Sequence, residues 1–443
     1  MHTRINSSHL FLFLLFFSMI MPTFHGHMGR AGLGIVNGLL ITVLAIFFLI
    51  EGKRKNMLSY LGDCKLAFLY IVPFLVLLII IPVSMSAGVL MEGTDLIMRD
   101  FYELHKPALN FLVFLFSFFL AIKSSRLIFF ERSLVYLFFL VVLLGLNHYI
   151  NLYPISTMYT GLNNIESGRV STPFSNPYDY AFFMTFFVYY FFSKLLFSSF
   201  SRYIIVFLLS LIMLILPQSR SVVAGFIVGF FVITPMVLTY FGLNIKQNKI
   251  RVSLLLYYFC FIVLVLVLLF SLPYLLENFS YLTGQFVRFF ENGDIGNSAG
   301  HRLNQFLFAI DRANSSLIIF LFGNGPSKGE MALVESIYSY LLFRYGLMGF
   351  LCYFFILFLS AYQCFRILKS MNAKNTDYAF FMAVLLWLLT VPLLSIGNNF
   401  TEQVRLSFFY YTLLGLVGGY YQFYFRVSKN ENYLRNNAVP SSK

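Results

Sequence analysis

The sequence predicts an all-α protein, a polytopic bundle of about 12 transmembrane helices, and three observations lead to this fold class. Of the 443 residues, 59% are hydrophobic and 20% aromatic, but only 11% are charged, whereas a soluble domain typically has about 25% charged residues. Stretches without Asp, Glu, Lys or Arg recur along the chain, each near the length of about 20 residues that a helix needs to cross the hydrocarbon core. They are continuously apolar instead of alternating, which favours helices over a membrane barrel.

The predicted spans form a single integral membrane domain, residues 1–443, without a large soluble part. In chain order they cover 9–25, 33–50, 66–90, 107–122, 133–150, 180–193, 203–218, 221–243, 252–276, 345–365, 378–396 and 406–425. Only Lys194 and Arg202 separate the sixth span from the seventh. The first span follows Arg4 as a signal peptide would, but its length and the lack of an Ala-x-Ala site after it favour an uncleaved helix.

Basic residues predict the orientation of the spans. When the amino terminus is placed in the cytoplasm and the helices alternate, most of the 31 Lys and Arg residues fall in cytoplasmic segments, including the tail 427–443. The positive-inside rule is then satisfied with both termini cytoplasmic. The net charge of +13 therefore reflects topology and attraction to anionic lipid in the bilayer. No nucleic acid partner is expected, because the chain offers no soluble basic domain to bind one.

No metal, cofactor or structural disulfide is expected. The four cysteines fall on the predicted cytoplasmic side or inside predicted helices, away from the outer loops where a disulfide would persist. They are Cys64, Cys260, Cys352 and Cys364. His25 and His27 form a pair without nearby Cys or carboxylate partners, which is not the pattern of a zinc site.

Two predicted outer loops are long enough to be functional, residues 151–177 and 277–334. The second loop includes a segment, 301–313, whose apolar residues follow helical spacing and which we expect to form an amphipathic helix on the outer membrane face. Those apolar residues are Leu303, Phe306, Leu307 and Ile310. An apolar run, 317–322, follows, and Gly323-Asn324-Gly325-Pro326 predicts a turn.

Arginine is concentrated in the later outer segments, against the positive-inside trend, so a partner should hold it there. These residues are Arg169, Arg220, Arg288, Arg302, Arg312, Arg344 and Arg405. Because the guanidinium fork matches phosphate and carboxylate, an anionic substrate at the outer face is expected. Arg220, at the junction of two spans and flanked by Ser219 and Ser221, could be an interfacial anchor, but its uncharged surroundings favour a functional role.

Glu335 is the candidate general base. If the helix that contains Arg344 continues outward, Glu335 lies about 13 Å above that residue and shares a face with Tyr338 and Ser339. A carboxylate at this position could accept a proton from an incoming hydroxyl. It could equally form an ion pair with an arginine.

Two further groups have weaker claims. Arg302 and Arg312 flank the amphipathic helix, where a charged face is usually solvated, and for Arg312 alone we expect that outcome. Asn176-Pro177-Tyr178-Asp179 precedes the sixth span and could bind substrate or simply begin a helix with an acidic first turn.

The order of these motifs over roughly residues 170–415 resembles that of the bacterial O-antigen polymerases (Wzy), which share a superfamily with the O-antigen ligases. The motifs are, in order, Asn176-Pro177-Tyr178-Asp179, Ser219-Arg220, Arg302 in the long outer loop, the spacing of Arg312 and Gly323, Glu335-Ser336-Ile337-Tyr338, and Arg344-Tyr345-Gly346-Leu347-Met348-Gly349.

The resemblance implies a metal-independent glycosyltransferase of the bacterial inner membrane, with a GT-C-like architecture and a role in lipopolysaccharide biosynthesis. A hydroxyl of a new lipid-linked repeat unit would attack the anomeric carbon of the growing chain and displace undecaprenyl pyrophosphate. Arg220 and Arg302 would hold the pyrophosphate, and Glu335 would be the base. A co-polymerase that regulates chain length is an expected partner. Further candidates for binding pyrophosphate or sugar are Arg169, Arg312, Arg344, Tyr338, Asn176 and Asp179.

Two alternatives remain open. A ligase would transfer finished polymer to lipid A core, but the resemblance implies a His-containing motif where this chain has Glu335, and no His follows His301. A flippase would carry lipid-linked oligosaccharide without chemistry, but carriers commonly show inverted repeats and broken helices. Neither pattern is evident here, and the predicted spans are almost without charge, so the sequence favours a polymerase.

Overall fold

The computed structural model describes residues 7–22, 43, 65–123, 127–151, 155–160, 168–198, 200–244, 257–258, 262, 296–373 and 375–437. All of the regular structure in these residues is helical. Within the described part of the chain, six helical segments are long and apolar enough to cross a membrane: Leu69–Glu92, Met98–Ile122, Phe129–Tyr149, Pro177–Phe197, Arg220–Gly242 and Ile337–Ser370. Shorter apolar helices cover His9–Ile20, Tyr203–Ile215 and Tyr378–Leu394. The chain is therefore an all-α, multi-pass membrane protein, as predicted.

The helices, in chain order, are α1 (Ser7–Ile20), α4 (Lys65–Ala87), the π-helix η1 (Gly88–Glu92), α5 (Met98–Phe101), α6 (His105–Lys123), α7 (Leu127–Tyr149), the 3₁₀ turn η2 (Ser156–Met158), α9 (Pro177–Phe197), α10 (Phe200–Ile215), α11 (Arg220–Val228), the π-helix η3 (Gly229–Ile233), α12 (Thr234–Asn244), α15 (Gly296–Ser315), α16 (Leu317–Phe322), α17 (Ile337–Ser370), α18 (Tyr378–Leu394), the 3₁₀ turn η4 (Phe400–Glu402) and α19 (Val404–Asn437). The predicted spans 33–50 and 252–276 lie almost wholly outside the described residues, so the number of spans stays a prediction.

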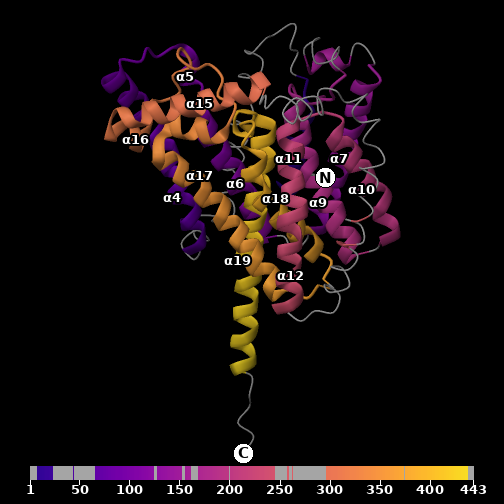
Figure 1. Ribbon diagram of the computed structural model, residues 1–443. Coiled ribbons are helices and arrows are strands. Elements are labelled where there is room, and N and C mark those ends of the chain that lie inside the picture. The colour runs from indigo at the N-terminus through magenta and orange to yellow at the C-terminus, as the bar shows by residue number, and fades with distance from the viewer. Residues whose placement is uncertain are drawn as a thin grey trace, which may run out of the picture.

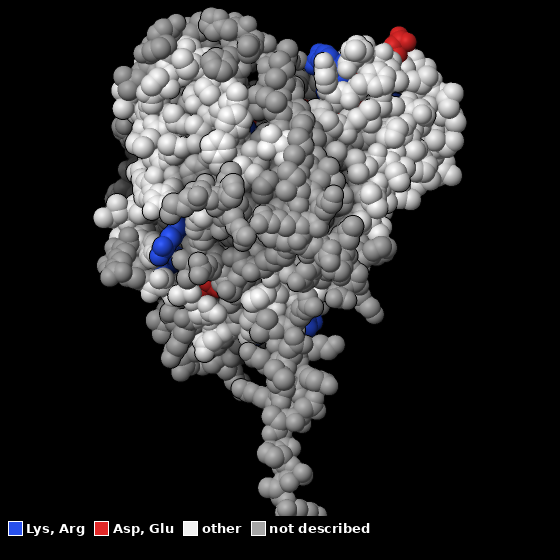
Figure 2. Space-filling model, turned by 180° about the vertical axis from the view of Figure 1, so that it is seen from behind, with Lys and Arg blue, Asp and Glu red and all other residues white. Residues whose placement is uncertain are grey.

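Most of these helices run along one direction and form a bundle, whereas α5, α15 and α16 lie across one end of it (Figure 1). The predicted amphipathic helix 301–313 is confirmed as part of α15, which already begins at Gly296. At the opposite end, α19 extends beyond the bundle and remains helical to Asn437, past the predicted start of a tail at residue 427. On the face seen in Figure 2, few charged side chains of the described residues are visible, and they lie near the upper end and in the lower half.

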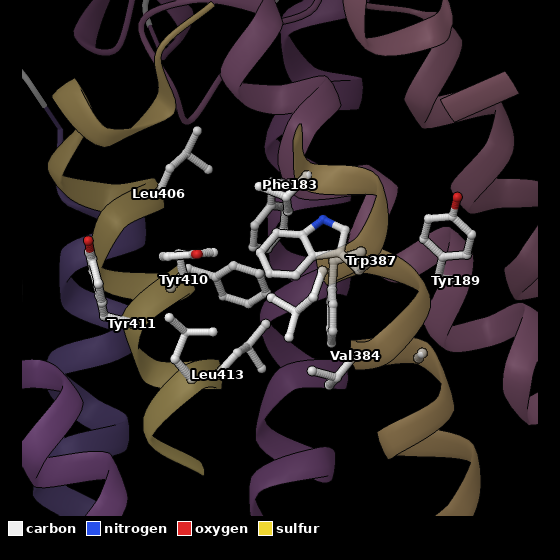
Figure 3. Packing of buried hydrophobic residues seen from close by; sticks show 14 of the residues in the cluster. Phe183, Tyr189, Val384, Trp387, Leu406, Tyr410, Tyr411 and Leu413 are labelled. Atoms are coloured by element: carbon white, nitrogen blue, oxygen red, sulfur yellow. The ribbon is translucent and has the colours of Figure 1, made fainter. Parts of the chain in front are cut away.

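Aromatic side chains fill the interior of the bundle around α9, whose residues are buried over the whole helix. Figure 3 shows Trp387 of α18 between α9 and α19. Its ring centroid lies 5.5 Å from that of Phe186 and 5.9 Å from that of Tyr410. Where α19 crosses α6, a Cβ on Gly415 would lie 2.4 Å from the carbonyl oxygen of Phe114. Glycine is therefore required for these two helices to approach so closely.

α17 begins only at Ile337, so the expectation that one continuous helix carries Glu335 beyond Arg344, on a common face with Tyr338 and Ser339, is wrong. The helix is also broken at Gly346, inside the predicted span 345–365. Gly346 has φ 61° and ψ −164°, a conformation that only glycine adopts without strain. Two carbonyl groups next to the break accept hydrogen bonds from the turn after α16: Asn324 N donates to Phe343 O at 2.9 Å, and Gly325 N to Arg344 O at 3.0 Å. The helix itself begins only at Ile337, and Glu335 lies in the non-helical segment before it.

Candidate functional site

A cavity of about 300 Å³ lies at the end of the bundle that α15 crosses (Figure 1). Its walls come from the starts of α9 and α11, from the first turns of α15, from the extended segment 333–335, and from the loop 397–403 between α18 and α19. Its lining residues are Arg169, Asn176, Tyr178, Ser219, Arg220, Ser221, Ser298, Arg302, Leu333, Val334, Glu335, Gly397, Asn398, Asn399, Glu402 and Gln403.

Three of the predicted arginines meet in this cavity. Arg220 is the first residue of α11, and Arg302 lies in the first half of α15. Arg169 precedes α9, and its Nε donates to the carbonyl oxygen of Pro217 at 3.2 Å. Two glutamates, Glu335 and Glu402, also line the cavity. The formal charge of the lining is therefore positive, as an anion-binding site requires.

Helix termini add to this positive potential. α9 and α11 both begin at the cavity, with Asn176 and Ser219 as their N-cap residues. The first backbone N–H groups of a helix have no acceptor inside the helix and carry a partial positive charge. At α11 the N-cap residue Ser219 makes no side-chain cap, and such a terminus favours phosphate and other anions as the arginines do. At α9, Pro177 has no N–H and Tyr178 N donates to Asn176 Oδ1, so this terminus adds only its helix dipole.

Glu335 and Arg302 form an ion pair that is open to the cavity. Arg302 Nε donates to Glu335 Oε2 at 2.7 Å, and the two side chains are 31% and 38% exposed. Among the described residues, none accepts a hydrogen bond from the Nη atoms of Arg302 and none donates one to Glu335 Oε1. One edge of the guanidinium and one carboxylate oxygen therefore stay available to a ligand.

Gln305 positions Glu335 and was missed by the sequence analysis. Its Nε2 donates to the carbonyl oxygen of Leu333 at 2.9 Å, and its Oε1 accepts from Glu335 N at 3.0 Å. The carboxamide thus binds the extended segment as a neighbouring β-strand would, and it is only 5% exposed. The available signal was its position one helical turn after Arg302, which places both side chains on the same face of α15.

The loop between α18 and α19 forms the wall that the sequence analysis did not foresee. Gly397 packs so closely on α11 that a Cβ there would lie 2.1 Å from the Cβ of Ser221. Tyr178 fixes the loop from α9, because its hydroxyl donates to the carbonyl oxygens of Leu394 at 3.0 Å and Asn398 at 3.4 Å. The run Gly397-Asn398-Asn399 directly after an apolar span was the only indication of this wall.

Of the described arginines outside the cavity lining, Arg344 and Arg312 form ion pairs with glutamates. Arg344 is fully buried, and its Nη1 donates to Glu402 Oε1 at 2.9 Å while its guanidinium lies 4.7 Å from the ring centroid of Tyr340. Arg344 therefore lies behind the cavity wall and binds Glu402, which lines the cavity. Arg312, in the last turn of α15, pairs with Glu92 and with Glu330, so the expectation that its side chain is simply solvated is wrong.

The remaining candidates are divided between lining and interior. Asn176 lines the cavity and begins α9, which confirms that the Asn-Pro-Tyr-Asp element starts a helix. Asp179, in the first turn, is buried away from the lining, and neither of its oxygens accepts a hydrogen bond from a described residue.

Tyr338 and Arg405 lie outside the cavity lining. Tyr338 donates to the carbonyl oxygen of Pro392 at 2.8 Å. Arg405 donates to the carbonyl groups of Pro173 and Met21. Arg288 is not among the described residues.

The part of the chain that the structure describes contains no group of three or more His, Cys, Asp or Glu side chains placed to hold a metal ion. Comparison with protein-family models and with curated proteins finds no match. What the fold and the site define is an all-α membrane protein with an arginine-lined cavity at one end of its bundle.

Proposed function

We propose that this protein is a glycosyltransferase that polymerises lipid-linked oligosaccharides at the outer face of the bacterial inner membrane. In this reaction the growing chain leaves undecaprenyl pyrophosphate and is transferred to a hydroxyl of a new lipid-linked repeat unit. The observation that carries the proposal is the convergence of Arg169, Arg220 and Arg302 with a half-exposed carboxylate, Glu335, in one cavity at the end of an apolar bundle. The motif order described above supports the same function.

The arginines suit the leaving group. When the bond between the anomeric carbon and the pyrophosphate oxygen breaks, its electron pair stays on that oxygen, and the negative charge there increases. Guanidinium groups placed at this oxygen stabilise the transition state more than the bound substrate, which is the requirement for catalysis. The planar fork of an arginine also matches two phosphate oxygens at once, whereas the ammonium group of a lysine does not.

The ion pair of Glu335 and Arg302 suits a base that becomes available on substrate binding. A pyrophosphate that binds the Nη atoms of Arg302 competes with Glu335 for the positive charge of the guanidinium. This weakens the ion pair between Glu335 and Arg302. The Oε1 atom of Glu335 then accepts the proton of the attacking hydroxyl as its oxygen bonds to the anomeric carbon. The proton thus moves to Glu335, and the new C–O bond forms as the bond to the pyrophosphate oxygen breaks and the lipid pyrophosphate leaves.

The placement of the site agrees with the orientation predicted from the basic residues. The cavity lies at the α15 end, and the carboxyl end of α19 projects from the opposite end (Figure 1). With the carboxyl terminus in the cytoplasm, the cavity opens on the outer side, where lipid-linked repeat units are joined according to this proposal.

Replacement of Arg220 by lysine tests the proposal, because it keeps the charge and removes the fork. In cells that depend on the variant, we expect single repeat units at the surface and no polymer, with normal amounts of protein in the membrane. The matched control is Arg366→Lys, the same change at an exposed position near the carboxyl end of α17. A normal sugar ladder with Arg220→Lys would contradict the proposal. Loss of all surface sugar, single units included, would instead indicate a flippase or a ligase.

A further inference from the structure

Three asparagines of the cavity lining share one hydrogen-bonding pattern. Asn176 Oδ1 accepts from Tyr178 N at 3.0 Å, and Asn398 Oδ1 accepts from Asn399 N at 2.7 Å. Asn399 Oδ1 accepts from Thr401 N at 3.1 Å and from the Thr401 hydroxyl at 2.6 Å. In each case the side-chain oxygen caps a nearby backbone N–H, as asparagine does at turns and helix starts.

This pattern fixes which end of each carboxamide remains for a ligand. A backbone N–H can only donate, so the atom that it contacts must be Oδ1, and the amide orientation is determined by the network. Each asparagine is therefore left with an NH₂ group, and no described residue accepts a hydrogen bond from any of the three. Asn399 is only 3% exposed, and its Nδ2 is buried without a partner. A buried donor without an acceptor is unfavourable, which marks this wall as incomplete without a ligand.

The excess of donors indicates the chemistry of that ligand. Of the two carboxylates of the cavity, Glu335 and Glu402, each has one oxygen paired with an arginine, Arg302 and Arg344, and the proposed function reserves the second oxygen of Glu335 for the attacking hydroxyl. A sugar hydroxyl that accepts from an asparagine must still donate its own proton, and this wall offers few free acceptors. A carbonyl or carboxylate oxygen accepts two hydrogen bonds and donates none. Phosphate oxygens also only accept, but the proposed function places the pyrophosphate at the arginines. A carbonyl or carboxylate oxygen on the sugar is therefore the remaining group that matches several NH₂ donors at once.

We propose that Asn176, Asn398 and Asn399, here called the asparagine wall, bind the sp² oxygen of an acyl or carboxyl substituent on a sugar of the substrate. That the ligand is a sugar rests on the proposed function. The arginines and the asparagine wall then divide the cavity between them, with the diphosphate at the guanidinium groups and the substituted sugar at the carboxamides. The wall would select repeat units by this substituent.

The test measures binding of free sugars to the purified full-length protein in detergent micelles. Saturation-transfer NMR compares N-acetylglucosamine, glucuronate and glucose, which carry an acyl group, a carboxylate and only hydroxyls at otherwise similar rings. Stronger binding of the first identifies an acyl oxygen as the ligand, and stronger binding of the second identifies a carboxylate. The variants are Asn398→Asp and Asn399→Asp, which keep the oxygen that caps the backbone and replace the NH₂ donor by a second acceptor.

The matched control is Asn375→Asp. Asn375 has the same arrangement, with its Oδ1 accepting from Asp377 N at 3.0 Å, but it is exposed in the turn between α17 and α18. We expect the wild-type protein and the control to prefer one of the two substituted sugars over glucose. In Asn398→Asp and Asn399→Asp that sugar should bind about tenfold more weakly, because an unpaired donor is lost and an acceptor now faces an acceptor.

Equal binding of the three sugars, no binding of any, or a preference that survives in both variants would overturn this inference. These outcomes are separate from failure of the proposed function, which is read from the sugar ladder of Arg220→Lys. A normal ladder in that variant together with a lost sugar preference in Asn399→Asp would leave the asparagine wall as a sugar site in a protein that is not a polymerase.

Discussion

The two ends of α15 show how the same residue types serve different purposes. Arg302 and Arg312 lie about 15 Å apart along this helix, and each pairs with a glutamate. Arg302 has one partner, Glu335, and the pair is about one-third exposed to the cavity. Arg312 binds Glu92 and Glu330 together, and its guanidinium also lies 5.4 Å from the ring centroid of Phe308.

The charged cluster around Glu103 has even more hydrogen bonds than the pair at Arg312. Glu103 is fully buried and accepts from Lys106 at 2.8 Å, from Lys328, and from the Tyr340 hydroxyl at 3.2 Å. Burial lowers the pKa of the Lys328 amine, and the Glu103 carboxylate opposes that effect. Both oxygens of Glu103 have partners, so this carboxylate serves to join helices. Glu335 has a free oxygen beside a cavity, so it is available for chemistry. Four substitutions test this distinction, beginning with the largest expected effect.

Arg302→Lys should reduce polymerisation by on the order of 10³, because an ammonium group cannot bind Glu335 and two phosphate oxygens in one plane. The measurement is the sugar ladder of cells that depend on the variant, with the amount of protein in the membrane determined in parallel. Arg312→Lys serves as the control at the other end of α15 and should leave chain length nearly unchanged. Equal loss of polymer in both variants would abolish the distinction between the two ends.

Glu103→Gln should lower the free energy of unfolding by about 3 kcal/mol, because two partly buried lysines, Lys106 and Lys328, lose their common counter-charge. The Lys328 amine then has no carboxylate to oppose burial, so its pKa falls further. The melting temperature in detergent measures the effect. Polymerisation per folded molecule should stay normal, since Glu103 does not line the arginine cavity. A stable variant without activity would place this cluster in the reaction instead.

Glu335→Gln should slow polymerisation by about 10²-fold without a matching loss of stability. The amide oxygen of glutamine still accepts from Arg302, but the side chain no longer accepts the proton of the attacking hydroxyl. Glu330→Gln is the matched control, since Glu330 is similarly exposed and pairs with Arg312. Near-normal chain formation by Glu335→Gln would remove this residue as the base.

The sequence predicted the membrane class and the grouping of Arg169, Arg220, Arg302 and Glu335 for one physical reason. Charges in an otherwise apolar chain are costly without a partner, so they stand out and tend to meet. The break in α17 could not be predicted, because Gly346 lies within an apolar run that reads as continuous helix. The break depends on N–H groups that the turn at Asn324 and Gly325 donates to it, and such a pairing is visible only in three dimensions.

The environments of some polar residues also could not be predicted from the sequence. On an amphipathic helix such as α15, Gln305 reads as solvated surface, although the structure buries it against the segment before α17. Asn398 and Asn399 follow an apolar span as a turn does, and the structure places both residues in the lining of the cavity. In both cases the packing partner that gives the residue a role lies far along the chain, so the neighbouring residues in the sequence do not reveal it.

The smallest expected effect sharpens the comparison most, because it concerns position and not charge. Gln305→Leu removes both hydrogen bonds to the segment 333–335 while keeping an apolar stem in a buried site. Arg302 and Glu335 remain, but the backbone that sets their separation is no longer fixed to α15, and polymerisation should fall by about tenfold. Gln305→Glu keeps the oxygen that accepts from Glu335 N and loses the donor to Leu333 O. It should therefore retain more activity than Gln305→Leu, provided that the segment is held mainly through Glu335 N. If both variants lose the same activity and also unfold at the same lower temperature, Gln305 stabilises the fold and does not position the base.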